Sequence, residues 1–196
     1  MSDKLKPSGE EEQYFQKEER EARERLRQEQ QLAAIRLQER KGIAEALHTN
    51  DEIANEAMSL GFDADTAPVL PFVPIIQVAW ADGNVSNAEN RKVLELAGQY
   101  GLAEGSPAHN FLKLLISERP SAAFFARVTT LMQRIVKDNP DDSINSNLLD
   151  LCVAVAQASG GFFGLTNPIG KEERALLQEF AAAFSVDRIE MPSLDE

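Results

Sequence analysis

The sequence predicts an all-α fold: a compact helical bundle preceded by a long charged N-terminal helix. No segment of the 196 residues alternates apolar and polar side chains with the period of two that a half-buried strand requires. Apolar residues recur instead at helical spacing, between Ser, Asn, Gly and Pro residues of the kind that begin and end helices. Because 43% of the residues are apolar, the chain can bury a core of ordinary size.

Residues 1–47 are predicted to be a charged helical extension, separate from a domain over residues 48–196. Residues 10–41 contain no Gly or Pro and are rich in Glu, Gln, Arg and Ala. Glu19 and Arg23 lie four positions apart in the acid-first order, which stabilises a helix by roughly 0.2–0.5 kcal/mol. The apolar stripe is thin, and its positions are Ala22, Leu26, Ala33, Leu37, Ala44 and Leu47.

Two interpretations of this extension remain open. A stable coiled coil needs sustained apolar seam positions, and here Glu29 and Arg40 interrupt the seam. The first interpretation is therefore a solvated helix that is mobile or lightly docked. The second is an arm that forms homo-oligomers or binds a partner protein, with Tyr14 and Phe15 as an apolar anchor.

The first half of the domain is predicted to contain four helices. Thr49 and Glu52 have the spacing of a capping box, so a short helix is expected to begin there and to end at Gly61. Several prolines follow, which places the next continuous helix at Pro74–Ala81. The two helices after it are expected to begin at Ser86 and at Ser106-Pro107, and to end at Gly101 and before Pro120.

Three more helices complete the predicted domain, from Ser121 to about Lys137, over residues 143–161 and over residues 170–186. The last two resemble an earlier stretch of the chain. "VAWADG" at 78–83 aligns with "VAQASG" at 155–160, and residues 85–102 align with residues 169–186. This alignment predicts an internal helix-turn-helix duplication, with copies at about 74–102 and 148–186, and it places Glu89 opposite Glu173.

The break between the two helices of the first copy is a candidate site for a divalent cation. Asp82, Asn84, Ser86 and Glu89 surround it and offer oxygen ligands of the kind that calcium prefers. The alternative needs no metal, because Ser86 and Glu89 have the spacing of a capping box and Asp82-Gly83 is a turn sequence. Both interpretations remain open from the sequence.

The stretch "FVPIIQVAWADGNVSNAENRKVLELAGQYGL" at 72–102 resembles the TerB-like family, which includes tellurite-resistance proteins and N-terminal domains of some DnaJ-type co-chaperones. The resemblance rests on Asp82, Gly83, Ser86 and Glu89. It implies an all-α bundle with internal duplication, a role in stress responses or membrane-associated complexes, and binding of a divalent cation, notably calcium. It assigns the cation to Asp82 and Glu89, with Glu173 as the counterpart in the second copy. The chain departs from the family pattern at Ser159 and in the inserted "GFFGLTNP".

That insertion is a second candidate site. Phe162, Phe163 and Leu165 are apolar residues among glycines, and exposed apolar side chains can mark a contact with a partner protein or, peripherally, with a membrane. The alternative is that they fold back over the bundle. Cys152 lies on an apolar helical stripe and is expected to be a buried thiol.

Charge and motifs narrow the classes of function. Residues 48–196 carry 10 basic and 21 acidic side chains, so their net charge of −11 argues against nucleic acid as a partner. The N-terminus lacks the apolar core of a secretory signal, which makes a cytoplasmic location the expected one. We therefore expect a non-enzymatic interaction module that binds a cation weakly. The alternatives are a metal-dependent enzyme that uses Asp82, Glu89 and Glu173, and a scaffold that acts through its N-terminal helix.

Overall fold

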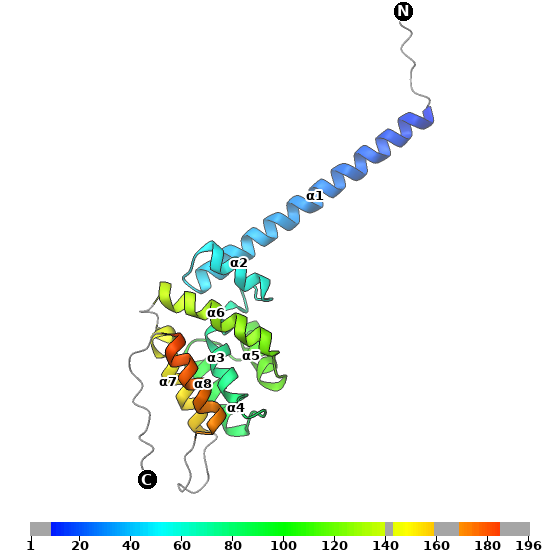
Figure 1. Ribbon diagram of the computed structural model, residues 1–196. Coiled ribbons are helices and arrows are strands. Elements are labelled where there is room, and N and C mark those ends of the chain that lie inside the picture. The colour runs from blue at the N-terminus through cyan, green and yellow to red at the C-terminus, as the bar shows by residue number, and fades with distance from the viewer. Residues whose placement is uncertain (1–8, 140–142, 159–168, 185–196) are drawn as a thin grey trace, which may run out of the picture. The chain divides into compact units, whose positions relative to one another are not determined.

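The all-α prediction is confirmed. A computed structural model describes residues 9–139, 143–158 and 169–184, and every regular element in these ranges is a helix (Figure 1). The chain divides into two units, Met1–Glu39 and Arg40–Glu196, whereas the sequence suggested a division after residue 47. Helix α1, Gly9–Ala46, belongs to the first unit except for its last two turns.

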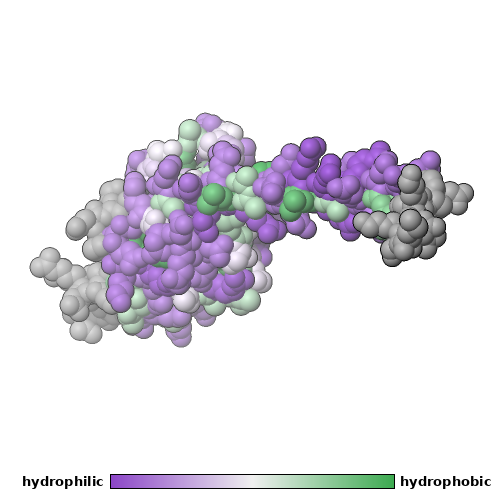
Figure 2. All heavy atoms as spheres, turned by 90° about the horizontal axis from the view of Figure 1, so that it is seen from above, coloured by the Kyte–Doolittle hydropathy of each residue, from purple (hydrophilic) through white to green (hydrophobic). Residues whose placement is uncertain are grey.

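In the first unit, α1 is a solvent-exposed helix over the residues whose burial the structure describes. Every side chain from Glu12 to Gln38 is exposed, including those of Leu26, Leu32, Ile35 and Leu37. The predicted pair of Glu19 and Arg23 forms, with 2.6 Å between Oε1 and Nη2. Most of the helix surface seen in Figure 2 is hydrophilic, with isolated apolar residues. The helix is thus held by its own hydrogen bonds and charge pairs.

The second unit begins with the last turns of α1 and the turn after it, because Ile43 and Leu47 are buried in its core. Helix α2, Asp51–Ser59, follows after a short turn. The predicted cap at Thr49 is wrong. Asn50 is the N-cap instead, and its Oδ1 accepts hydrogen bonds of 3.0 Å from the backbone N–H groups of Glu52 and Ile53. Asn is a preferred cap residue, and here it stands one position closer to the helix.

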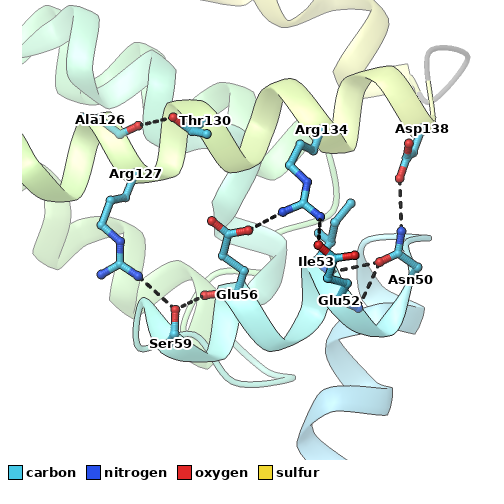
Figure 3. A network of polar contacts seen from close by, with 10 residues as sticks. All are labelled: Asn50, Glu52, Ile53, Glu56, Ser59, Ala126, Arg127, Thr130, Arg134 and Asp138. Carbon is cyan, nitrogen blue, oxygen red and sulfur yellow. Dashed lines mark hydrogen bonds and ion pairs between the residues drawn. The ribbon is translucent and has the colours of Figure 1, made fainter.

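Helix α2 is attached to α6, Ala122–Asp138, by polar contacts along one side (Figure 3). Arg134 lies between two carboxylates of α2, at 2.6 Å from Glu56 and 2.8 Å from Glu52. The amide of Asn50 donates to Asp138 at 3.3 Å, and Arg127 donates to the hydroxyl of Ser59 at 3.0 Å. These contacts span α2 from its N-cap to its last residue.

The centre of the unit is α3, Val73–Ala79, which continues from the 3-10 helix η1, Ala67–Phe72. Pro68 and Pro71 lie in the 3-10 helix. Pro74 stands in the first turn of α3, where a proline is tolerated because it removes no hydrogen bond of the helix. All residues of α3 except Gln77 are buried. The helix packs against α4, α6, α7 and α8 (Figure 1), which explains why all of its residues except Gln77 are apolar.

The remaining helices surround α3: α4, Asn87–Gln99; α5, Pro107–Ser117; α7, Ser143–Ala158; and α8, Lys171–Ala183. The predicted caps Ser86, Ser106 and Ser121 are confirmed, since each hydroxyl accepts a backbone hydrogen bond from the third residue of its helix. The internal duplication stays a prediction, because the first helix of one copy differs in length from the first helix of the other. Helix α3 has 7 residues and α7 has 16. No helix in the described part of the chain combines the length and apolarity needed to cross a membrane.

Candidate functional site

The turn between α3 and α4 carries the first candidate residues. Asp82 is exposed, and its Oδ1 accepts a 3.0 Å hydrogen bond from the backbone N–H of Asn84. Gly83 has φ of +94°, a backbone conformation that disfavours other residues. The Asp82-Gly83 pair therefore makes a turn in which the Asp82 side chain is tied to its own loop.

Ser86 and Glu89 form the predicted reciprocal capping box. The Ser86 hydroxyl accepts from the backbone N–H of Glu89 at 3.2 Å, and Glu89 Oε2 accepts from the backbone N–H of Ser86 at 2.7 Å. The carboxylate thus points back toward the helix N-terminus, where the helix dipole favours negative charge.

Glu173 has the equivalent position at the start of α8. Its Oε2 accepts a 2.6 Å hydrogen bond from the backbone N–H of Gly170. Glycine supplies no hydroxyl, so only half of the capping box exists here. A Cβ at position 170 would lie 3.2 Å from Glu173 Oε2, which indicates that glycine makes room for this carboxylate.

The fold brings the two glutamates together. Glu89 and Glu173 are 2% and 5% exposed, and their side chains lie within hydrogen-bonding reach of each other. Burial raises the pKa of Glu89 above its usual value. The hydrogen bonds from Ser86 oppose this rise, the charge of Asp82 adds to it, and the contact with Glu173 opposes it.

This arrangement gives the pair a defined chemistry. Two buried carboxylates in contact repel each other when both are ionised, so a proton or a cation between them lowers the free energy of the site. Asp82 acts on Glu89 through its charge, while Asn84 and Ser86 belong to the loop beside it. Within residues 12–139, 147–158 and 169–184, however, no three His, Cys, Asp or Glu side chains form a ready cage for a metal ion.

The predicted partner-binding residues fall in two places. Tyr14 and Phe15 are exposed by 59% and 62%, and their rings form an edge-to-face pair with centroids 6.1 Å apart. The Tyr14 hydroxyl donates to Glu18 at 2.9 Å, and this hydrogen bond raises the pKa of the phenol. Phe162, Phe163 and Leu165 lie outside the described residues.

The prediction that Cys152 is a buried thiol is confirmed. Its side chain is fully buried in α7, and this burial raises the pKa of the thiol. A thiol without access to solvent or to the thiolate state does not act as a nucleophile in the folded protein.

Sequence reasoning missed a surface feature, a groove of about 530 Å³ between α4 and α5. Asn90 and Leu94 line it from α4, and Lys113 and Leu114 line it from α5. The signal in the sequence was faint, because each helix contributes only one side and neither side forms a motif. A second groove, of about 650 Å³, lies over α3 between α6 and α8.

The chain was compared with protein-family models, with curated protein sequences and with solved structures, and it matches none of them.

Proposed function

We propose that residues 40–196 form a non-enzymatic, TerB-like binding module, in which the carboxylates of Glu89 and Glu173 together take up a divalent cation with low affinity. The observation that carries this proposal is the meeting of two buried glutamates from helix starts that are far apart in the sequence. A structural cap needs only one carboxylate at each helix. When both carboxylates are ionised, bringing the two caps into contact adds a repulsion that a cation would relieve.

The donor set agrees with weak binding. Glu89 and Glu173 supply carboxylate oxygens, and Ser86 and Asn84 add a hydroxyl and an amide oxygen in the adjoining loop. Calcium takes six to eight oxygens, so water or backbone carbonyls would complete its shell. Because the site has few charged ligands, we expect a dissociation constant on the order of 10⁻⁴–10⁻³ M.

A metal-dependent enzyme is the less favoured alternative. Such an enzyme needs its carboxylates in an open cleft where a substrate can reach the ion. Glu89 and Glu173 are almost fully buried, and only Asp82 of the three candidate carboxylates is exposed. The burial of the pair therefore favours a structural or regulatory cation over a catalytic one.

Isothermal titration calorimetry with calcium and with magnesium tests the proposal. Wild-type protein should give saturable heat at millimolar ion, and Glu173→Gln should abolish it. Asp82→Ala should weaken binding less, because Asp82 contributes charge near Glu89 from an exposed turn. Glu95→Gln on the exposed face of α4 is the matched control and should bind as the wild type does. Absence of heat from the wild type would leave Glu89 and Glu173 as helix caps only.

A further inference from the structure

The groove between α4 and α5 combines an exposed apolar surface with polar groups that have no partner among the described residues. One end is formed by Trp80, at the end of α3, and by Asn84 and Val85 in the loop before α4. Along the groove, α4 and α5 face each other with side chains spaced by one helical turn. Its volume of about 530 Å³ lies in the range of sites that bind small ligands or short peptide segments.

The apolar part of the groove is unusually open to solvent. Leu114 is 45% exposed, and it is the one exposed large apolar side chain among the described residues of the second unit. Trp80, Val85 and Leu94 beside it are half-buried. The indole N–H of Trp80 donates to the carbonyl of Leu115 at 3.1 Å, which holds the ring in place. The groove therefore offers a preformed surface for one apolar side chain.

The polar part of the groove is made of amides. Asn84, Asn90 and Asn110 line it, and the side chains of Asn84 and Asn90 form no hydrogen bond with the described residues. Asn110 uses its Nδ2 to donate to the carbonyl of Gly105, which leaves its Oδ1 as an acceptor. A carboxamide both donates and accepts, as a peptide unit does. An extended peptide has unpaired backbone groups that such amides can satisfy, whereas a helical peptide does not.

The charge of the groove differs from that of the domain. Residues 48–196 have a net charge of −11, yet among the residues that the structure describes no Asp or Glu lines this groove. Lys113 lines it, and this ammonium group forms no ion pair within the described part of the chain. The groove over α3, by contrast, is lined by Glu172 and Glu179 as well as by Arg119. A lysine with no carboxylate beside it favours an anionic group on the ligand.

We propose that the groove between α4 and α5 binds an extended segment of a partner protein, in which an apolar side chain packs between Trp80 and Leu114 and a neighbouring acidic side chain pairs with Lys113. The asparagines hydrogen-bond the backbone of that segment. This inference rests on the proposed role as a binding module, but it does not require the cation, because neither Glu89 nor Glu173 lines the groove and Asn84 is the one residue that both proposals use.

The experiment uses the full chain and two synthetic peptide pools, acetyl-X-X-Leu-Asp-X-X-amide and acetyl-X-X-Leu-Lys-X-X-amide, with Trp excluded from X. Trp80 is the single tryptophan of the chain, so its fluorescence reports binding directly. In EDTA, the Leu-Asp pool should change the Trp80 emission in a saturable way, and the Leu-Lys pool should bind about tenfold more weakly.

Variants then locate the contact. Lys113→Glu should reverse the preference between the two pools, and Leu114→Ser should abolish binding of both. Lys137→Glu, an exposed charge reversal at the end of α6, is the control and should leave both responses unchanged. Because Trp80 also lines the other groove, Arg119→Glu is included and should have no effect.

The proposal is overturned if the two pools bind equally well, if Lys113→Glu leaves the preference intact, or if Arg119→Glu abolishes the response. Working in EDTA separates this outcome from the cation proposal. If the peptide binds but calcium gives no heat in calorimetry, only the cation proposal is rejected. If calcium gives heat but the peptide does not bind, only the peptide proposal is rejected.

Discussion

At the scale of single residues, Glu89 has two opposed electrostatic surroundings. The N-terminus of α4 and the backbone N–H of Ser86 stabilise its ionised form. Burial and the charge of Asp82 destabilise it, and the pKa of Glu89 is raised as a result. The carboxyl is therefore poised to take up a proton, or a cation in its place, without any change in the helix that it caps.

The raised pKa of Glu89 predicts a pH dependence of stability. A carboxyl whose pKa is higher in the folded than in the unfolded state contributes stability that is full below the unfolded value, 4.5, and is lost as pH rises through the folded value. The free energy of unfolding should therefore fall from about pH 4.5 upward, and Glu89→Gln should reduce this fall. Urea unfolding across this pH range measures it. Glu95→Gln is the control and should keep the wild-type dependence of the free energy of unfolding on pH. If Glu95→Gln reduced this dependence as much as Glu89→Gln does, the account would be contradicted.

Gly42 is a residue whose small size is required by a close approach. A Cβ at this position would lie 2.6 Å from the Cβ of Ala64, whereas a Cβ at Gly98 in α4 would meet nothing within 4 Å. Both glycines lie in helices, where Ala is favoured by roughly 1 kcal/mol. Gly98→Ala should therefore stabilise the protein by about 0.5–1 kcal/mol. Gly42→Ala should destabilise it by about 1–3 kcal/mol, because overpacking outweighs propensity.

Chemical denaturation of both glycine variants checks this pair of predictions. If Gly42→Ala proved as stable as the wild type, α1 and the loop that carries Ala64 would not be packed as closely as the structure places them.

At the scale of elements, α2 is attached to α6 through Arg134 (Figure 3). The two carboxylates that pair with Arg134 differ in exposure: the Glu56 side chain is 32% exposed and that of Glu52 is 81% exposed. A double-mutant cycle between Arg134→Met and Glu56→Gln should give a coupling of about 0.5–1 kcal/mol, and the cycle with Glu52 should give less. Both couplings should shrink at high salt. Equal couplings would show that burial does not set their strength.

Helix starts were the elements most open to prediction from the sequence. Ser86, Ser106 and Ser121 cap the helices that follow them, because each combines a hydroxyl with a clear break in apolar spacing. Thr49 misled the prediction because Asn50, an equally good cap, stands next to it.

The alignment of the two copies also paired Glu89 with Glu173, but it could not show that the carboxylates meet, since contact depends on how α4 and α8 pack around α3 and α7.

The groove between α4 and α5 illustrates what a sequence leaves out. Lys113 and Leu114 follow one another in a helix that is apolar on its buried face, and neither residue stands out there. Their significance depends on Asn90 and Leu94 across the groove, and on a lining that contains no carboxylate from the described ranges. Such a surface arises from two helices together and has no motif on either one.

At the scale of the whole molecule, the second unit is predicted to fold without the first. All side chains from Glu12 to Gln38 are exposed, so their removal takes no described side chain from the core. A shortened chain that begins at Arg40 should unfold cooperatively, with a midpoint within about 2 °C of the full chain. Circular dichroism measures this. A larger drop in the midpoint would mean that residues 1–39 contribute packing to the folded state.

The same pair of chains tests the proposed oligomer arm. If α1 associates with a second copy through Leu26, Leu37 and the Tyr14–Phe15 pair, the full chain should sediment as a larger species than the shortened one by more than the deleted mass. Equal oligomeric states in analytical ultracentrifugation would end the self-association hypothesis.

The central claim is that Glu89 and Glu173 act as one site for a divalent cation. Carbon NMR of the glutamate side-chain carboxyl groups during a calcium titration at neutral pH tests it most directly. The account predicts that the Glu89 and Glu173 carboxyl resonances shift together and saturate with one dissociation constant, while that of Glu95 stays in place. Resonances of the pair that respond to pH but not to calcium would contradict it, and would assign the pair to proton sharing alone.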